Sequence, residues 1–241
     1  MSAVIVTGAS RGFGRAIAAA MVASGRDVVG IARDAAALDA VRAELGPTFT
    51  PLVGDATEEA LAADAIAEHR PDLLVLNAGA IPHMAPVHEH SWESFSRNWH
   101  VDTKHAFVWT SAALRAPLAP GSVVVSMSSG AVLFGASPLS GGYTGANATI
   151  RYLTAYAAEE AERAGLGIRF VTLFPALTPS GIGSIAVDHY ARRAGVDRET
   201  FIEGKQPVLT PDMVGKAVLE VAADPDAAAE YRLTGTGLAP V

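Results

Sequence analysis

Short apolar runs rich in β-branched residues alternate along this chain with Ala-rich segments whose apolar positions recur every three to four residues. Such runs are typical of strands buried on both faces, and such segments are typical of helices with one apolar face. The strand candidates read AVIVTG, DVVGIA, FTPLVG, DLLVLNAG, SVVVSMSS and GIRFVTLFP. Their alternation with helices predicts a three-layer α/β fold of the Rossmann type, with a doubly wound parallel sheet between two layers of helices.

Helices are predicted at about residues 12–24, 34–45, 57–69, 91–116, 142–164 and 211–223. Asp34 and Thr57 are expected to cap two of them. Thr210 and Pro211 form a cap followed by a proline in the first helical position, which predicts where the last helix begins. A short final strand is expected at 231–235.

Residues 178–207 fit this alternation least well, because they hold many Gly and Pro around one short amphipathic piece, IAVDHYARRAG. An insertion at this point is expected to cover a substrate pocket. No repeat or linker interrupts the rest of the chain. Residues 1–241 are therefore predicted to form a single domain.

The composition of the chain argues against some classes of binding partner and metal site. With a formal net charge of −7 and no run of Lys or Arg, the chain is not expected to bind nucleic acid or an anionic membrane. The absence of Cys excludes disulfides and thiolate metal sites. The opening residues do not read as a basic and apolar leader, and no apolar stretch of about 18 residues occurs, so a cytoplasmic location is expected.

A glycine-rich turn, TGASRGFG, joins the first predicted strand to the first predicted helix. Glycines let the backbone approach a pyrophosphate closely, and a helix N-terminus offers unpaired N–H groups and a positive dipole. A short turn of this kind can also be purely structural, but its place between strand and helix favours dinucleotide binding. The residues expected to contact the cofactor here are Gly8, Ser10, Arg11, Gly12, Phe13 and Gly14.

The spacing of the three glycines resembles the TGxxxGxG motif of the short-chain dehydrogenases/reductases, a family of Rossmann-fold oxidoreductases. The segments GDAT, LNAG and FPALTP resemble further motifs of that family, in the family's order. The likeness extends over about residues 3–235. It implies a nicotinamide cofactor that is also contacted by Asp55, Ala56, Asn77, Ala78, Gly79, Tyr143, Asn147, Pro175 and Thr178.

Two arginines bear on which nicotinamide cofactor is bound. Arg33 follows the second predicted strand about 20 residues beyond the glycines, where an acidic residue would accept hydrogen bonds from the free 2′-hydroxyl of NAD. Arg11 adds a second guanidinium inside the turn. Guanidinium groups pair well with phosphate, so NADP(H) is predicted rather than NAD(H). Both side chains could instead lie in solvent or bind carboxylates of a helix.

The resemblance also implies the reacting groups. In the family a Ser orients the substrate carbonyl, a Tyr transfers the proton, a Lys four residues later lowers the pKa of the Tyr, and an Asn anchors a relay of water. Ser129 and Tyr143 match the first two, with Ser128 as the alternative because the Ser–Tyr spacing is one residue longer than usual. Asn147 occupies the Lys position, and Asp102 in WHVDTKHAF occupies the Asn position.

These two departures predict impaired catalysis. Positions 143 and 147 share one face of a helix, but Asn147 brings no charge to stabilise a tyrosinate and Asp102 adds a negative one. Lys104 is not expected to compensate for the missing cation, since residues i and i+2 on a helix do not share a face. A neutral Tyr143 can donate a proton, so carbonyl reduction should suffer less than alcohol oxidation.

The sequence therefore predicts an NADP(H)-dependent oxidoreductase scaffold whose activity is impaired by Asn147, whether that residue is natural or introduced. The alternative is a non-redox enzyme (isomerase, lyase or cyclase) or a non-catalytic protein that binds NADP(H) or another ligand. Tyr143 and Ser129 could also be packing or strand-end residues, and Asn147 could bond locally within its helix.

Five of the seven histidines lie between residues 83 and 105, but their spacing matches no metal site on a predicted helix. No metal is expected, and His83 is expected to face the substrate. The side chains of 178–207 predict a mostly apolar small carbonyl or alcohol substrate with a polar end. The resemblance implies a homodimer or homotetramer, with 91–116 and 142–164 as candidate interface helices.

Overall fold

Eight strands form one sheet in the computed structural model of the protein, which describes residues 3–134 and 137–241. The strands are β1 (Val4–Thr7), β2 (Val28–Ala32), β3 (Phe49–Val53), β4 (Leu73–Leu76), β5 (Val123–Met127), β6 (Arg169–Pro175), β7 (Glu230–Thr234) and β8 (Gly237–Pro240). Their order across the sheet is β3-β2-β1-β4-β5-β6-β7-β8. All neighbouring pairs are parallel except β7 and β8, so the predicted doubly wound parallel sheet is confirmed.

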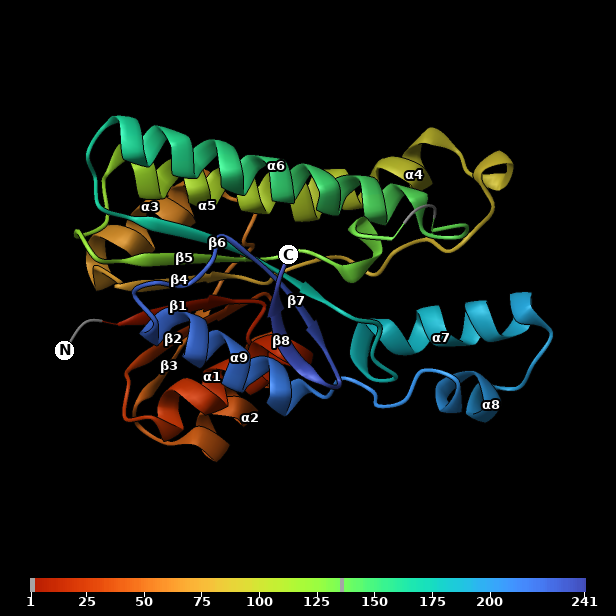
Figure 1. Ribbon diagram of the computed structural model, residues 1–241. Helices are drawn as coiled ribbons and strands as arrows, with labels where there is room; N and C mark the ends of the chain where they lie inside the picture. Colours follow the sequence, from red (N-terminus) through yellow and green to blue (C-terminus); the bar gives the residue numbers. More distant parts are fainter. Residues whose placement is uncertain (1–2, 135–136) are drawn as a thin grey trace.

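Helices cover both faces of this sheet, as the three-layer prediction requires (Figure 1). One layer holds α1 (Gly12–Ala23), α2 (Ala35–Leu45) and α9 (Pro211–Ala223), and the other holds α3 (Glu59–His69), α5 (Lys104–Arg115) and α6 (Gly141–Arg163). Alternate residues of each strand point to opposite faces. Val4 and Val6 accordingly join the core beneath α1, whereas Ile5 joins the core that contains Trp109 of α5.

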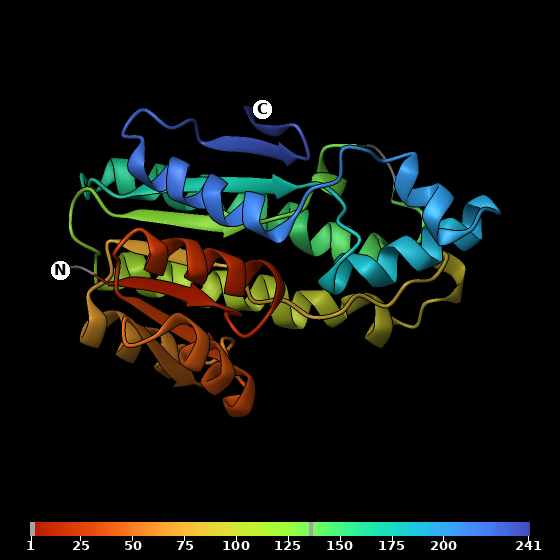
Figure 2. The same cartoon turned by 90° about the horizontal axis from the view of Figure 1, so that it is seen from below.

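The order of strands reverses beside β1, because the chain passes from β1 outward to β3 and then returns to β4 on the other side of β1. Open parallel sheets bind ligands at such a reversal, outside the carboxyl ends of the strands. The turns after β1 and β4 meet there. Two further helices, α7 (Gly181–Ala194) and α8 (Arg198–Glu203), project beyond this same edge of the sheet (Figure 2).

The helix caps follow local sequence in two of three predicted cases. The side chain of Asp34 accepts a hydrogen bond from the N–H of Ala37, and that of Thr210 accepts one from Met213, so both predicted caps are confirmed. The prediction for Thr57 is wrong, since α3 begins at Glu59. Both the N–H and the hydroxyl of Thr57 donate instead to Asp55, which holds Thr57 in the turn before the helix.

The helix predicted at 91–116 is interrupted in the structure. It consists of α4 (Trp92–Asn98), a π-helical turn at Trp99–Thr103 and α5. A π turn inserts an extra residue and changes the direction in which its side chains point, and such turns are frequent at functional sites. Asp102 lies in this turn, so its direction could not be obtained from regular helical spacing.

The C-terminal third contains elements that the sequence pattern did not predict. Residues 178–207 were expected to hold one short amphipathic piece, but they form α7 and α8. The final strand expected at 231–235 is present as β7, and β8 then pairs with it in the antiparallel direction. β8 was not predicted, because GLAP is a four-residue edge segment without apolar alternation.

Candidate active site

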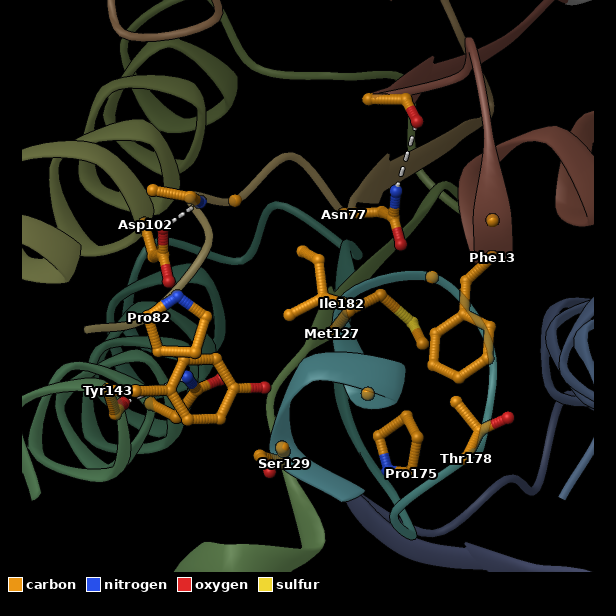
Figure 3. Close-up of a pocket in the computed structure, with 18 of the residues that line it drawn as sticks. Phe13, Asn77, Pro82, Asp102, Met127, Ser129, Tyr143, Pro175, Thr178 and Ile182 are labelled. Carbon is orange, nitrogen blue, oxygen red and sulfur yellow. Dashed lines mark hydrogen bonds between the residues drawn. The ribbon is translucent and has the colours of Figure 1, made fainter. Parts of the chain in front are cut away.

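A cavity of about 1180 Å³ lies at the carboxyl edge of the sheet. Its wall runs from the glycine-rich turn and the end of β2, past the β4 and β5 ends, to the faces of α6, α7 and α8. Figure 3 shows Tyr143 and Ser129 on one side of this cavity, with Phe13 and Asn77 on the other and Ile182 between them.

The cavity collects nearly all of the residues that the sequence singled out. Its wall includes Gly8, Ser10, Arg11, Gly12, Phe13, Arg33, Asp55, Ala56, Asn77, Ala78, Gly79, Asp102, Ser129, Tyr143, Asn147, Pro175 and Thr178. Gly14 is the exception. A β-carbon there would lie 2.2 Å from the carbonyl oxygen of Gly8 and 2.6 Å from Nδ2 of Asn77, so Gly14 is needed for close packing beneath the turn rather than for ligand contact.

The glycine-rich turn is shaped for close approach to a ligand. Gly8 and Gly12 have φ angles of 69° and 56°, which side-chain-bearing residues rarely adopt. A β-carbon on Gly12 would meet no atom within 4 Å, so this part of the turn is open, and the first N–H groups of α1 begin beside it. A helix N-terminus with an open glycine turn suits a phosphate group.

Hydrogen bonds tie the β4 end to this turn. The hydroxyl of Thr7 accepts from the N–H groups of Asn77 and Ala78 at 2.9 and 3.2 Å, and Nδ2 of Asn77 donates to the carbonyl of Thr7 at 3.1 Å. The Nε2 atom of His105 lies 2.9 Å from the same hydroxyl. Burial lowers the pKa of His105 to about 4, so this imidazole is neutral at physiological pH and acts in the network as an uncharged partner.

At the far end of the cavity, Arg33 and Asp55 face each other. Nη1 of Arg33 lies 3.9 Å from the Asp55 carboxylate, and the Arg33 side chain is 75% exposed. Hydrogen bonds from Thr57, with the nearby charges of Arg33 and Lys104, hold the pKa of Asp55 below its usual value. Arg33 is thus only loosely engaged, while the Asp55 carboxylate is firmly held by its neighbours.

Ser129 and Tyr143 both lie in the wall of the cavity. Burial raises the pKa of Tyr143 to about 12, while a hydrogen bond from Ser129 opposes that rise and the charge of Asp102 adds to it. The hydroxyl of Ser128 donates elsewhere, to the carbonyl of Asn147 at 3.0 Å. Ser129 lowers the pKa of Tyr143 while Ser128 is bonded to α6, so Ser129 is the better candidate to act with the tyrosine.

Asn147 lies one helical turn after Tyr143 on the cavity side of α6 and is only 3% exposed. Its Nδ2 atom donates to the carbonyl of Tyr143 at 3.0 Å, within the same helix. Lys104, the other cation considered for this place, is exposed and acts on Asp55 instead. Of the residues the structure describes, none places a positive charge against the Tyr143 hydroxyl.

Asp102 is 4% exposed, and its carboxylate is held from two sides. One oxygen accepts from the N–H of Ala80 at 2.7 Å and the other from Nδ2 of Asn98 at 2.9 Å. Burial raises its pKa to about 6, although both hydrogen bonds act in the opposite direction. Figure 3 shows Asp102 next to Pro82, with Pro82 between it and the ring of Tyr143.

This raised pKa gives a testable dependence of stability on pH. The unfolded chain loses the Asp102 proton near pH 4, whereas the folded chain retains it to about pH 6, so the folded chain binds more protons between these values. The free energy of unfolding therefore falls as pH rises through that window, by about 2 kcal/mol from this group. We expect Asp102→Asn to remove this component of the slope.

The measurement is urea unfolding of both proteins at about pH 4.5 and about pH 7.5. Asp39→Asn serves as the control, because Asp39 is exposed on α2. An unchanged slope in Asp102→Asn would show that the carboxyl group titrates as it does in the unfolded chain.

His83 was predicted to face the substrate, but the structure does not place it in the cavity wall. Pro82 and Met84 line the cavity, and His83 between them is exposed and packs its ring 5.3 Å from that of His90. In extended backbone alternate side chains point in opposite directions, which explains the difference. The histidine in the wall is His105, and its signal was its place in WHVDTKHAF, three residues after Asp102.

Metal ligation is not indicated by the described part of the chain. Within residues 3–134 and 137–241, no three His, Asp or Glu side chains are grouped so that they could hold a metal ion.

Tyr190, from the segment 178–207 that was expected to cover the substrate, lies in the cavity wall together with Ser137 and Ser140, which the sequence did not single out. The hydroxyl of Tyr190 on α7 lies 2.7 Å from that of Ser137 and 3.1 Å from that of Ser140. These bonds join α7 to the segment just before α6, close to Tyr143. Residues 135 and 136, in the loop between Ser129 and Tyr143, lie outside the described residues.

Comparison with known proteins finds dehydrogenases. The sequence profile of the short chain dehydrogenase family matches residues 2–189. The chain is 28% identical to serine 3-dehydrogenase of Agrobacterium fabrum over 92% of this chain and 88% of that protein. It is 44% identical to a "Probable NADP-dependent dehydrogenase" of Dichelobacter nodosus, over 36% of this chain and 86% of that protein.

Solved structures agree with the fold. An oxidoreductase of the short chain dehydrogenase/reductase family from Burkholderia thailandensis superimposes with a TM-score of 0.76 at 25% identity, covering 97% of this chain and 88% of that one.

Proposed function

The chain belongs to the short chain dehydrogenase family, and on this premise we propose that it is an NADP(H)-dependent oxidoreductase that reduces a carbonyl group or oxidises the corresponding alcohol. The observation that carries the proposal is that Ser129 and Tyr143 line one cavity together with an open glycine-rich turn. Two hydroxyls at one point can hold a carbonyl oxygen and exchange a proton with it.

The cavity residues suit a dinucleotide. The turn at Gly8 to Gly12 and the N-terminus of α1 would hold the pyrophosphate, and the Asn77 to Gly79 segment and Thr178 would lie along the remaining length. When bound, the nicotinamide would supply or accept the hydride. The chain's own side chains supply orientation and the proton.

In this proposal Ser129 orients the substrate carbonyl and Tyr143 gives it a proton. With a pKa of about 12, Tyr143 holds its proton at physiological pH, which is the form required for donation to a developing alkoxide. Alcohol oxidation needs the tyrosinate, and Asn147 brings no charge to stabilise it. The activity is therefore impaired, and reduction is the less impaired direction.

Binding and turnover together test this function. NADPH binding is measured by its fluorescence, and NADPH oxidation is followed with a panel of aldehydes and ketones. The proposal expects NADPH binding and slow but measurable reduction of at least one carbonyl class. Absence of NADPH binding would overturn it.

The cofactor preference rests on Arg33, which is exposed, loosely engaged and in the cavity wall. The Dichelobacter nodosus relative, whose name describes it as NADP-dependent, supports the same choice. We expect Arg33→Ala to weaken NADPH binding roughly 10-fold or more while leaving NADH binding nearly unchanged, since a charge-assisted hydrogen bond contributes on this scale.

The measurement is the dissociation constant for NADPH and for NADH, in the parent chain and in Arg33→Ala. Arg15→Ala is the matched control, because Arg15 pairs with Glu44 on the protein surface and is absent from the cavity wall. Equal weakening of both cofactors in Arg33→Ala would show that Arg33 does not contact the 2′-phosphate.

A non-redox function is the second candidate, and one observation favours it. Asn147 is buried and satisfied within its own helix, so the site is complete without a cation beside Tyr143. An isomerase, lyase or cyclase, or a protein that only binds NADP(H), would bind the cofactor without consuming it. The Asn147→Lys experiment in the Discussion separates the two candidates.

Residues 178–207 are proposed to cover the substrate, since α7 and α8 contribute to the cavity wall. The apolar side chains among them favour a mostly apolar small molecule. None of the described helices combines the length and apolar character that a membrane span requires. A cytoplasmic location and a single-domain chain stay predictions of the sequence.

Self-association is proposed through α5 and α6. Their outer faces expose large apolar rings, with Phe107 49%, Tyr152 74% and Tyr156 53% exposed. The ring centroids of Tyr152 and Tyr156 lie 6.4 Å apart, on one face of α6. Exposed apolar surface of this kind is typical of protein interfaces. Light scattering should give a dimer or tetramer that Tyr156→Glu dissociates, and a monomeric parent chain would contradict the proposal.

A further inference from the structure

One face of α7 follows the cavity along its length. Ile182, Ala186, Tyr190 and Arg193 all line the wall, and their spacing of about four residues places them on one side of the helix. At 1.5 Å of rise per residue, positions 182 and 193 are about 16 Å apart along the axis. Figure 3 shows Ile182 pointing into the cavity near Met127, so Arg193 marks its outer end.

The position of this face is fixed from two sides. The hydroxyl of Tyr190 is bonded to Ser137 and Ser140, as described above. Arg198 of α8 donates to the carbonyls of Ser184 and Pro179 at 3.2 and 3.0 Å and also pairs with Asp188 of α7. These contacts hold α7 and α8 together as one cover.

Two cations of the wall come from the cover, Arg193 on α7 and Lys205 just after α8. Within the described residues neither is in an ion pair. The ammonium of Lys205 lies 5.5 Å from the ring centroid of Phe201, which also lines the cavity. Both positive charges are therefore available to a ligand.

The carboxylates of the described wall are already engaged. Asp34 caps α2, Asp55 accepts from Thr57, and Asp102 accepts from Ala80 and Asn98. None of these three belongs to the cover. The cover therefore brings an excess of positive charge to the cavity, beside the apolar path along α7.

We propose that this cavity takes an elongated carbonyl substrate with an apolar middle and an anionic far end, which Arg193 and Lys205 bind. The inference rests on the proposed reductase function and specifies its substrate class. The carbonyl lies at Ser129 and Tyr143, and the chain of the substrate follows Ile182 and Ala186 outward. Hydride from NADPH and the proton of Tyr143 convert the carbonyl to an alcohol, and the anionic end is unchanged.

The test uses aldehydes of two chain lengths, each with a carboxylate at the other end. The value of kcat/KM is measured for 10-oxodecanoate and its methyl ester, and for 4-oxobutanoate and its methyl ester, on the parent chain and on Asn147→Lys. We expect the long acid to be preferred over its ester roughly 10-fold, because two partly exposed ion pairs contribute on this scale. The short acid should show no preference, and added salt should reduce the preference of the long one.

The double variant Arg193→Gln/Lys205→Gln should lose the preference for the long acid and keep the kcat/KM of the ester and the KM of NADPH. Arg192→Gln is the matched control, because Arg192 is the neighbouring exposed arginine of α7 and is absent from the wall. A raised KM for NADPH with both substrates would assign the two cations to the cofactor and overturn the inference, as would an unchanged preference.

A binding experiment keeps the test independent of turnover. Decanoate and decanamide are titrated into the NADPH complex, with the fluorescence of NADPH as the signal, and decanoate should bind roughly 10-fold more tightly in the parent chain but not in the double variant. Equal affinity would overturn the inference. If decanoate is preferred but no aldehyde is reduced even by Asn147→Lys, the anion site stands and the reductase proposal fails.

Discussion

Asn147→Lys is expected to reduce aldehydes and ketones with NADPH roughly 10- to 100-fold faster than the parent chain. The reason is electrostatic. Tyr143 has a pKa of about 12 because it is buried and because Asp102 adds negative charge, and only the Ser129 hydrogen bond acts against this. A cation one helical turn away, on the same face, lowers such a pKa by about one to three units, which makes the tyrosine a stronger acid.

The gain should appear in kcat, and the pH dependence should move with it. We expect the rise of the oxidation rate with pH to occur at lower pH in the Lys variant, since the tyrosinate then forms more readily. Asn147→Met is the control, because it is close to Lys in length but carries no charge.

Three outcomes decide between the proposals. A gain with Lys alone supports a reductase impaired at position 147. An equal gain with Met would assign the effect to packing in the buried wall around Asn147. If both variants bind NADPH and neither reduces any carbonyl, the redox function loses its support and the non-redox candidate replaces it.

Tyr143→Phe is expected to lower kcat by about 10²- to 10⁴-fold, measured in the Asn147→Lys background where the rate is easier to follow. The phenyl ring fills the same space, so the change removes the proton donor and the hydrogen bond from Ser129 but little of the packing. NADPH affinity should be nearly unchanged. A combined loss of NADPH binding would indicate that the wall itself has been disturbed.

Tyr152→Phe is the matched control for that experiment. Tyr152 lies on the same helix, α6, but is 74% exposed and outside the cavity wall. A loss of less than about 10-fold in Tyr143→Phe would mean that another group, or water, donates the proton. The role of Tyr143 in the proposed function would then be wrong.

The packing of helices α4 and α6 shows a limit of prediction from local sequence. Gly142, directly before Tyr143, reads from the sequence only as a poor helix former. In the structure a β-carbon there would lie 2.1 Å from the carbonyl oxygen of Phe95, so the glycine is needed where α4 crosses the first turn of α6. No pattern near position 142 could reveal a neighbour that is 47 residues away in the chain.

What the sequence determined by itself is local or periodic. Apolar runs, helix spacing and the caps at Asp34 and Thr210 depend on residues within a few positions of one another, and they predicted the parallel sheet and both helical layers. The motif order identified the wall of the cavity, and the Tyr143 and Asn147 positions followed from the i, i+4 geometry of one helix.

What only the tertiary structure decided depends on segments that the fold brings together from distant parts of the chain. The packing role of Gly14 and the place of His105 beside Thr7 were both settled by such contacts, and the bond of Ser128 to α6 favours Ser129 as the serine of the proposed function. The same holds for the two cations that the cover brings to the cavity wall, Arg193 of α7 and Lys205 just after α8. Crossover connections bring these groups together, and the resulting distances and burial, which set their pKa values, are not encoded in any short stretch of sequence.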